Sequence, residues 1–221
     1  MTPDQINEIR LNPYKDDFPL LSRNADLAFL DSAATAQRPA CVLDAQRSFY
    51  ETMNANALRG LYRLSVEATQ AINDARHTVA SFIGASESRD IVFCRNTSEA
   101  LNIIAKSFGA SVLKPGDEVC ISIMEHHSNL IPWQQVCRAT GASLVYLRPD
   151  KQGIITAEEM DRKINQRTKI VSVTHVSNVL GIENPVVELG KRVHAVGGYL
   201  VVDGAQSVPH ISVDVKQIGC D

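Results

Sequence analysis

The stretch Gly198-Tyr-Leu-Val-Val-Asp-Gly-Ala-Gln206 decides how this chain of 221 residues folds. Its apolar run, Tyr199–Val202, is typical of a strand buried on both faces of a parallel sheet. The run ends at Asp203, and two small residues follow it. Ligands of open α/β sheets bind outside the carboxyl ends of the strands, which is where Asp203 is expected. The alternative is that Asp203 is a helix cap or a turn former, so the other strand ends must decide.

Apolar runs alternate with helical patterns from residue 90 onward. The predicted strands are 90–94, 118–124, 143–147, 169–176 and 198–202, and the predicted helices between them are 98–108, 129–139, 157–164 and 186–196. This alternation indicates an α/β fold with a mostly parallel sheet and helices on both faces. Two further helices are predicted over 40–53 and 65–83. We expect an N-terminal segment, 1–25, followed by one domain, 26–221.

The composition narrows the class of protein. The chain is 44% hydrophobic and 21% charged with a net charge of −3, which gives no basic surface for nucleic acid. It has no apolar run of about 18 residues, so no membrane span is expected. Its first residues lack the layout of a signal peptide. Five cysteines without a CxxC pair predict neither a disulfide framework nor a zinc site, and favour a reducing, cytoplasmic location.

Polar residues follow two of the predicted strands and open helices. Thr97 and Ser98 begin the helix after strand 90–94, where two hydroxyls can cap the helix or bind a phosphate together with its free N–H groups. His126 follows strand 118–124 and begins a histidine pair. A histidine there is structural, or it lies over an aromatic ligand and relays a proton. No further residues with metal-ligand spacing accompany it, so no metal site is predicted.

The next two strands end in the same way, with Asn178 after strand 169–176 and Asp203 with Gln206 after strand 198–202. One shared site explains four polar strand ends better than four separate turns do. A phosphate at the helix start, a ring beside His126 and a carboxylate at a ring nitrogen fit pyridoxal 5′-phosphate, in which such an Asp makes the ring an electron sink. Neither GxGxxG nor GxxxxGK[ST] occurs, so nucleotide-binding alternatives lack their signatures.

Five motifs in this order resemble the SufS-type cysteine desulfurases, which are class V aminotransferase-like enzymes of fold-type I. The motifs are Leu30-Asp-Ser-Ala-Ala-Thr-Ala-Gln-Arg-Pro39, Arg95-Asn-Thr-Ser-Glu99, Met124-Glu-His-His-Ser-Asn129, Thr174-His-Val-Ser-Asn-Val-Leu-Gly181 and Val202-Asp-Gly-Ala-Gln206. The resemblance runs from about Phe18 to Asp221. It implies the large domain of a pyridoxal-phosphate-dependent transferase.

The resemblance also implies a role for each matching residue. Thr97 and Ser98 would hold the phosphate, and Asp203 would pair with the pyridine nitrogen. His126 would stack on the ring and serve as the catalytic residue that assists proton transfer. The remaining residues complete the pocket: Gln206 for the ring hydroxyl, Asn178 for cofactor and substrate, and Ala33 and Ala34 for the substrate.

Family enzymes convert L-cysteine to L-alanine and leave the sulfur as a persulfide on an enzyme cysteine. An acceptor protein then carries that sulfur into iron–sulfur cluster assembly, and the enzymes are homodimers. The resemblance implies these partners for this protein.

The chain departs from the family pattern in two places. Leu58 and Tyr62 replace two histidines of a segment that otherwise keeps Arg-Gly. The family's Schiff-base lysine, its persulfide cysteine and its carboxylate-binding arginine would all lie beyond Asp221, and neither Cys220 nor Lys216 is assigned to those roles. The chain is therefore expected to be the N-terminal portion of a longer enzyme, and inactive alone. The alternatives are a selenocysteine lyase, another class V enzyme, or a non-catalytic binding protein.

Overall fold

The computed structural model describes residues 13–221, and the chain divides into two compact units, Met1–Asp74 and Ala75–Asp221. The predicted division into a segment 1–25 and a domain 26–221 is not tested by this division and stays a prediction. Residues 1–12 of that segment lie outside the described residues.

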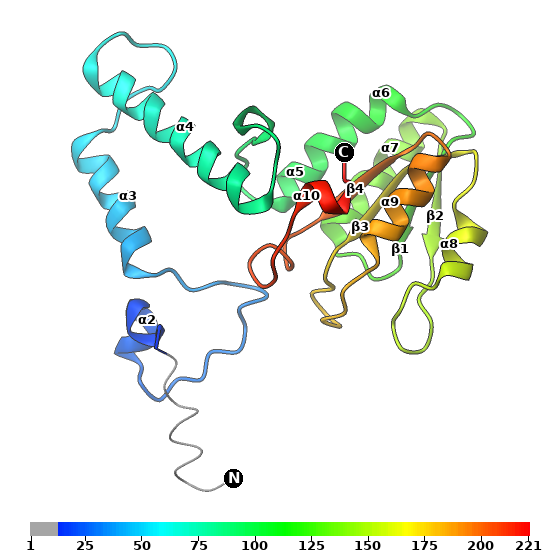
Figure 1. The fold of residues 1–221 in the computed structure, drawn as a ribbon, viewed down its shortest axis with the longest axis horizontal. Coiled ribbons are helices and arrows are strands. Elements are labelled where there is room, and N and C mark those ends of the chain that lie inside the picture. The colour runs from blue at the N-terminus through cyan, green and yellow to red at the C-terminus, as the bar shows by residue number, and fades with distance from the viewer. Residues whose placement is uncertain (1–12) are drawn as a thin grey trace, which may run out of the picture. The chain divides into compact units, whose positions relative to one another are not determined.

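The described part of the first unit is helical. Its elements are η1 (Lys15–Asp17), α2 (Pro19–Arg23), α3 (Ala40–Thr52) and the start of α4 (Arg63–Ile83), which continues into the second unit (Figure 1). Proline stands at the beginning of two of these helices: Pro19 is in the first turn of α2, and Pro39 is the N-cap of α3. The fixed φ of proline suits these positions, where a helix needs no N–H donor.

The loop between α3 and α4 is held to the first turns of α4. Leu58 has a φ of 72°, a left-handed conformation that costs energy in a residue with a branched side chain. Its N–H donates to Thr69 Oγ1 at 2.8 Å. The fully buried Ser65 hydroxyl donates to the Asn56 carbonyl at 2.7 Å and accepts from the Gly60 N–H at 3.0 Å. These bonds maintain the strained turn.

The second unit is built around a sheet of four parallel strands in the order β2-β1-β3-β4. The strands are β1 (Glu118–Ser122), β2 (Ser143–Leu147), β3 (Thr168–Thr174) and β4 (Tyr199–Asp203). All five residues of β1 are buried, as expected for the centre of a parallel sheet covered on both faces. These strands confirm four of the five predicted ones, with ends that differ by a few residues.

Alternate strand residues form two separate cores, one on each face of the sheet. Cys120, Val171 and Leu200 pack with side chains of α8 (Ala157–Lys163), α9 (Val186–Ala195) and α10 (Val215–Ile218). Their neighbours in sequence, Val119, Ile170 and Val201, pack with α5 (Thr97–Ile104) and α7 (Ile131–Thr140), including the fully buried Trp133. Figure 1 shows these helices around the sheet. The prediction of helices on both faces is confirmed.

The predicted strand 90–94 is wrong. Its beginning lies in the 3₁₀ helix η2 (Ser88–Asp90), and residues 91–94 belong to none of the described strands. Val92 is 75% exposed and Phe93 is 53% exposed. An apolar run satisfies its backbone groups as a strand only if a neighbouring strand supplies hydrogen bonds, and the four described strands pair with one another.

The predicted helix 98–108 is more complex than its pattern indicated. After α5, the backbone widens into the π-helical turn η3 (Ala105–Gly109) and continues as α6 (Ala110–Val112). Gly109 lies against the indole of Trp133, and a Cβ atom there would stand 2.9 Å from Trp133 Cζ3. A glycine is therefore required where this helix passes the largest buried side chain.

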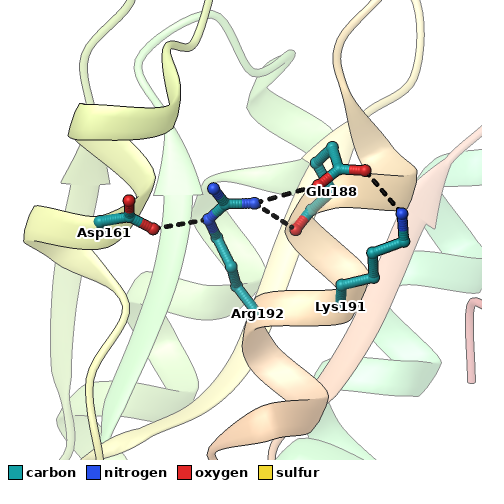
Figure 2. A network of polar contacts seen from close by, with 4 residues as sticks. All are labelled: Asp161, Glu188, Lys191 and Arg192. Atoms are coloured by element: carbon teal, nitrogen blue, oxygen red, sulfur yellow. Dashed lines mark hydrogen bonds and ion pairs between the residues drawn. The ribbon is translucent and has the colours of Figure 1, made fainter.

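Charged side chains join α8 and α9 on the outside of the second unit (Figure 2). Arg192 Nε donates to Asp161 Oδ1 at 2.7 Å, and Arg192 Nη1 lies 3.2 Å from Glu188 Oε2. Lys191 Nζ donates to Glu188 Oε1 at 2.7 Å. Such solvent-facing pairs contribute little to stability. None of the helices in the described part of the chain is long and apolar enough to cross a membrane.

Candidate active site

The carboxyl edge of the sheet brings together the segments that follow β1, β3 and β4. In the register of the sheet, Thr174 at the end of β3 lies opposite Asp203 at the end of β4. The His175 N–H donates to the Asp203 carbonyl at 2.9 Å, which extends this pairing beyond β3. The edge is therefore continuous at the position of Asp203.

Asp203 is a buried carboxylate at the end of a strand. Its side chain is part of a residue that is 5% exposed, and Oδ1 accepts from the Ala205 N–H at 3.0 Å. The structure thus gives Asp203 the turn-forming contact of the simpler interpretation. The same contact fixes the carboxylate at the sheet edge, so the two interpretations are compatible.

The start of α5 has the features of an anion site. Asn96 is the N-cap, and its Oδ1 accepts from the Glu99 N–H at 2.9 Å. Thr97 and Ser98 occupy the first turn, where N–H groups have no partner within the helix and the helix dipole is positive. Glu99 is paired with Arg95, and hydrogen bonds from Arg95 lower the pKa of this carboxyl.

A chain of hydrogen bonds connects Ser98 with His126. The two hydroxyl oxygens of Ser98 and Ser128 are 2.5 Å apart, and Ser128 Oγ is 2.9 Å from His126 Nδ1. The Ser128 N–H also donates to His126 Nδ1 at 3.1 Å. A backbone N–H can only donate, so Nδ1 is an acceptor and the neutral imidazole carries its proton on Nε2. Two residues predicted to share a site are thus linked through one serine.

Glu125 is a residue of this edge to which the sequence analysis assigned no role. Its carboxylate accepts from Ser122 Oγ at 2.5 Å, from Asn129 Nδ2 at 2.7 Å and from the Thr174 N–H at 2.8 Å. Burial raises the pKa of Glu125 to about 7, and the charge of Asp203 adds to the rise although the three hydrogen bonds oppose it. Its position directly before the histidine pair was the available signal.

The hydrogen bonds of Glu125 continue into the core. Asn129 is fully buried, and its Oδ1 accepts from Trp133 Nε1 at 2.9 Å and from Ser172 Oγ at 2.6 Å. We call Ser122, Glu125, Asn129, Trp133, Ser172 and Thr174 the Glu125 network. It joins the end of β1, the 3₁₀ helix η4 (His127–Asn129), helix α7 and strand β3.

The other predicted site residues all lie in turns. Asn178 is exposed, in a turn closed by the Gly181 N–H donating to the Ser177 carbonyl at 2.9 Å. Gln206 is half-buried, three residues after Asp203. Ala33 and Ala34 are exposed in a turn of the first unit. The substrate roles of Asn178, Ala33 and Ala34 stay predictions.

Three of the five cysteines have environments that suppress the thiolate. Burial raises the pKa of Cys120 to about 12 and that of Cys137 to about 11. Burial also raises the pKa of Cys220, whose thiol lies 3.8 Å from the Val215 carbonyl oxygen. A nucleophilic cysteine needs a lowered pKa, so none of these three is suited to accept sulfur.

Comparisons with known proteins identify the family of this chain. The pattern of the family described as aminotransferase class-V matches residues 28–221. The "Probable cysteine desulfurase" of Halalkalibacterium halodurans is 46% identical over 207 residues, which cover 92% of this chain and 51% of that protein. The cysteine desulfurase of Dickeya dadantii is 44% identical over 98% of this chain and 53% of its own length.

Solved structures give the same result. The apo structure of a cysteine desulfurase from Thermococcus onnurineus superposes with a TM-score of 0.88 at 38% identity, over 95% of this chain and 51% of that one. The cysteine desulfurase CsdA from Escherichia coli superposes with a TM-score of 0.84 at 33% identity. The chain spans about half the length of the curated relatives it matches. Its fold is that of the fold-type I enzymes, and the chain belongs to the aminotransferase class-V family.

Proposed function

We propose that this chain provides most of the cofactor-binding site of a cysteine desulfurase that uses pyridoxal 5′-phosphate. The observation that carries the proposal is the chain from Ser98 through Ser128 to His126, on the same sheet edge as Asp203. It joins a helix N-terminus suited to phosphate with an imidazole suited to an aromatic ring. The names of the relatives support the desulfurase assignment.

The donor set of this edge fits a phosphorylated pyridine. Thr97 and Ser98 would hold the phosphate with their hydroxyls and with the N–H groups of the first turn of α5. Asp203, buried and oriented by the Ala205 N–H, would keep a ring nitrogen protonated. His126 would lie against the ring, and Gln206 would bind its hydroxyl. When bound, such a cofactor supplies an electron sink that stabilises negative charge on the substrate carbon.

The proposed reaction takes L-cysteine to L-alanine. The carbon–sulfur bond breaks, a sulfur–sulfur bond forms with an enzyme thiolate, and the substrate carbon gains a proton. His126, whose Nδ1 accepts from the Ser128 N–H and whose proton is therefore on Nε2, would assist a proton transfer. Asn178, Ala33 and Ala34 would contact the substrate. The thiolate and the lysine that bind sulfur and cofactor covalently are not assigned to any residue of this chain.

The proposal extends to the partners of the enzyme. We infer a homodimer in the cytoplasm that passes its persulfide sulfur to an acceptor protein for iron–sulfur cluster assembly. The support for these inferences is the resemblance of the five motifs to the SufS-type enzymes.

The test is formation of alanine from L-cysteine by the protein expressed from its full reading frame, with a dithiol reductant added to reduce the persulfide and release its outer sulfur as sulfide. The wild-type protein should produce both with a bound chromophore, and Asp203→Ala should abolish alanine formation while circular dichroism is retained. Release of selenide from selenocysteine, without turnover of cysteine, would instead identify a selenocysteine lyase. A protein without a chromophore and without turnover would be a binding protein.

A further inference from the structure

Glu125 is a half-buried carboxyl that none of the proposed catalytic steps uses. Its oxygens receive donors from three different places: Ser122 at the end of β1, Asn129 in η4 and the backbone of Thr174 at the end of β3. The one charged group that raises its pKa is Asp203. Burying a carboxyl beside a like charge is costly, so its retention here suggests a task that a neutral apolar residue could not perform.

The three hydrogen bonds confine the segment that contains His126. Glu125 directly precedes His126, and Asn129 follows it by three residues. The Glu125 carboxylate accepts from Asn129 Nδ2 at 2.7 Å, which joins these two positions to each other. It also accepts from the Thr174 N–H at 2.8 Å, which joins both positions to β3. His126 itself is exposed, and only Ser128, which lies within the same segment, holds its Nδ1. The orientation of the imidazole therefore depends on the segment being fixed.

We propose that Glu125 is a positioning residue that holds the imidazole of His126 at the carboxyl edge by tying residues 125–129 to β1 and β3. The benefit to catalysis rests on the proposed function, whereas the positioning itself does not. It depends on the length of the side chain and on its two oxygen positions. Its charge is not required, because the Ser122 hydroxyl can accept from an amide as readily as it donates to a carboxylate.

Two substitutions of Glu125 distinguish the effect of side-chain length from the effect of charge. Glu125→Gln keeps the length, with Oε1 accepting from Asn129 and Thr174 and Nε2 donating to Ser122. Glu125→Asp keeps the charge but is one methylene shorter, so it cannot reach all three donors. Glu118→Asp is the matched control, because Glu118 stands at the other end of β1, is buried and accepts from Asn165 Nδ2 at 2.8 Å and Arg167 Nε at 2.8 Å.

The readout is the pair of ¹⁵N resonances of the His126 ring, measured on the full chain without cofactor above the pH at which the ring is protonated. We expect wild type, Glu125→Gln and Glu118→Asp to show Nδ1 as an acceptor and Nε2 with the proton. Glu125→Asp should show averaged tautomers. Averaging in Glu125→Gln, or an unchanged signature in Glu125→Asp, would overturn the proposal.

A second measurement links positioning to the cofactor. Glu125→Asp should weaken binding of pyridoxal 5′-phosphate to the full-length apoprotein by about tenfold or more, as expected for a disturbed contact with a charged ligand, and Glu125→Gln should not. If Glu125→Asp shows averaged tautomers of the His126 ring but an unchanged affinity for pyridoxal 5′-phosphate, the proposed role of His126 in cofactor binding is refuted. The proposal that Glu125 positions His126 would then still stand. Both results remain informative if the protein proves to have another activity.

Discussion

The raised pKa of Glu125 predicts a stability that depends on pH in a direction unusual for a glutamate. Burial and Asp203 raise its pKa from the ordinary 4.5 to about 7 in the folded protein. A carboxyl with a raised folded-state pKa contributes stability that is complete below pH 4.5 and is lost as the pH rises through about 7. Glu125→Gln stays neutral throughout, so it should escape this loss.

The size of the effect follows from the two pKa values. A pKa difference of about 2.5 corresponds to about 3 kcal/mol when the carboxyl is fully ionised, at about 1.4 kcal/mol per pKa unit. Part of the loss has already occurred at about pH 5. The stability advantage of the Gln variant over wild type should therefore grow by about 2.5 kcal/mol between about pH 5 and pH 8.5.

Urea unfolding followed by fluorescence is the suitable assay. Trp133 is the only tryptophan of the chain, is fully buried and donates to Asn129 within the Glu125 network. Comparing wild type and Glu125→Gln at each pH cancels the titration of all groups that the two proteins share. A difference in unfolding free energy that stays constant from about pH 5 to pH 8.5 would refute the reasoning, because it would mean that Glu125 titrates normally.

Three further predictions concern other contacts. Ser128→Ala should weaken binding of pyridoxal 5′-phosphate to the full-length apoprotein by up to about tenfold, since it breaks the link between Ser98 and His126; an unchanged dissociation constant would show that the link is incidental. Trp133→Phe removes the donor to Asn129 and should lower the unfolding free energy by about 1–3 kcal/mol, measured by circular dichroism in urea; the idea fails if the midpoint does not move. Arg192→Ala should cost less than about 1 kcal/mol in the same assay because its ion pairs face solvent, and a loss above about 2 kcal/mol would contradict this.

The parallel strands could be read from the sequence because each is an apolar run that ends at a polar residue, as Tyr199–Val202 ends at Asp203. The failure over 90–94 shows the limit of this signal. An apolar run indicates that a segment prefers burial, but it does not show whether another strand is available to pair with that segment. Val92 and Phe93 are exposed, and none of the four described strands pairs with their segment.

The candidate site was predictable only as far as strand ends reveal it. Asp203 and His126 could be placed on one edge because parallel strands share a direction. Glu125 could not be assigned to this site from the sequence, because a glutamate beside two histidines is usually a solvated charge. Only tertiary structure brings Thr174 and Asn129, from separate elements, to the same carboxylate oxygen, Oε2. The left-handed backbone of Leu58 is hidden for a similar reason, since leucine carries no signal for it.

The contact between Gly109 and Trp133 has a consequence for how sequences of this kind can diverge. Any side chain at position 109 would strike the indole, and the indole is in turn bonded to Asn129, which is bonded to Glu125. A substitution at 109 is therefore tolerable only when 133 becomes smaller, and that change removes a partner of 129. We expect positions 109, 125, 129 and 133 to vary together among relatives, because they connect the core to the edge of the sheet.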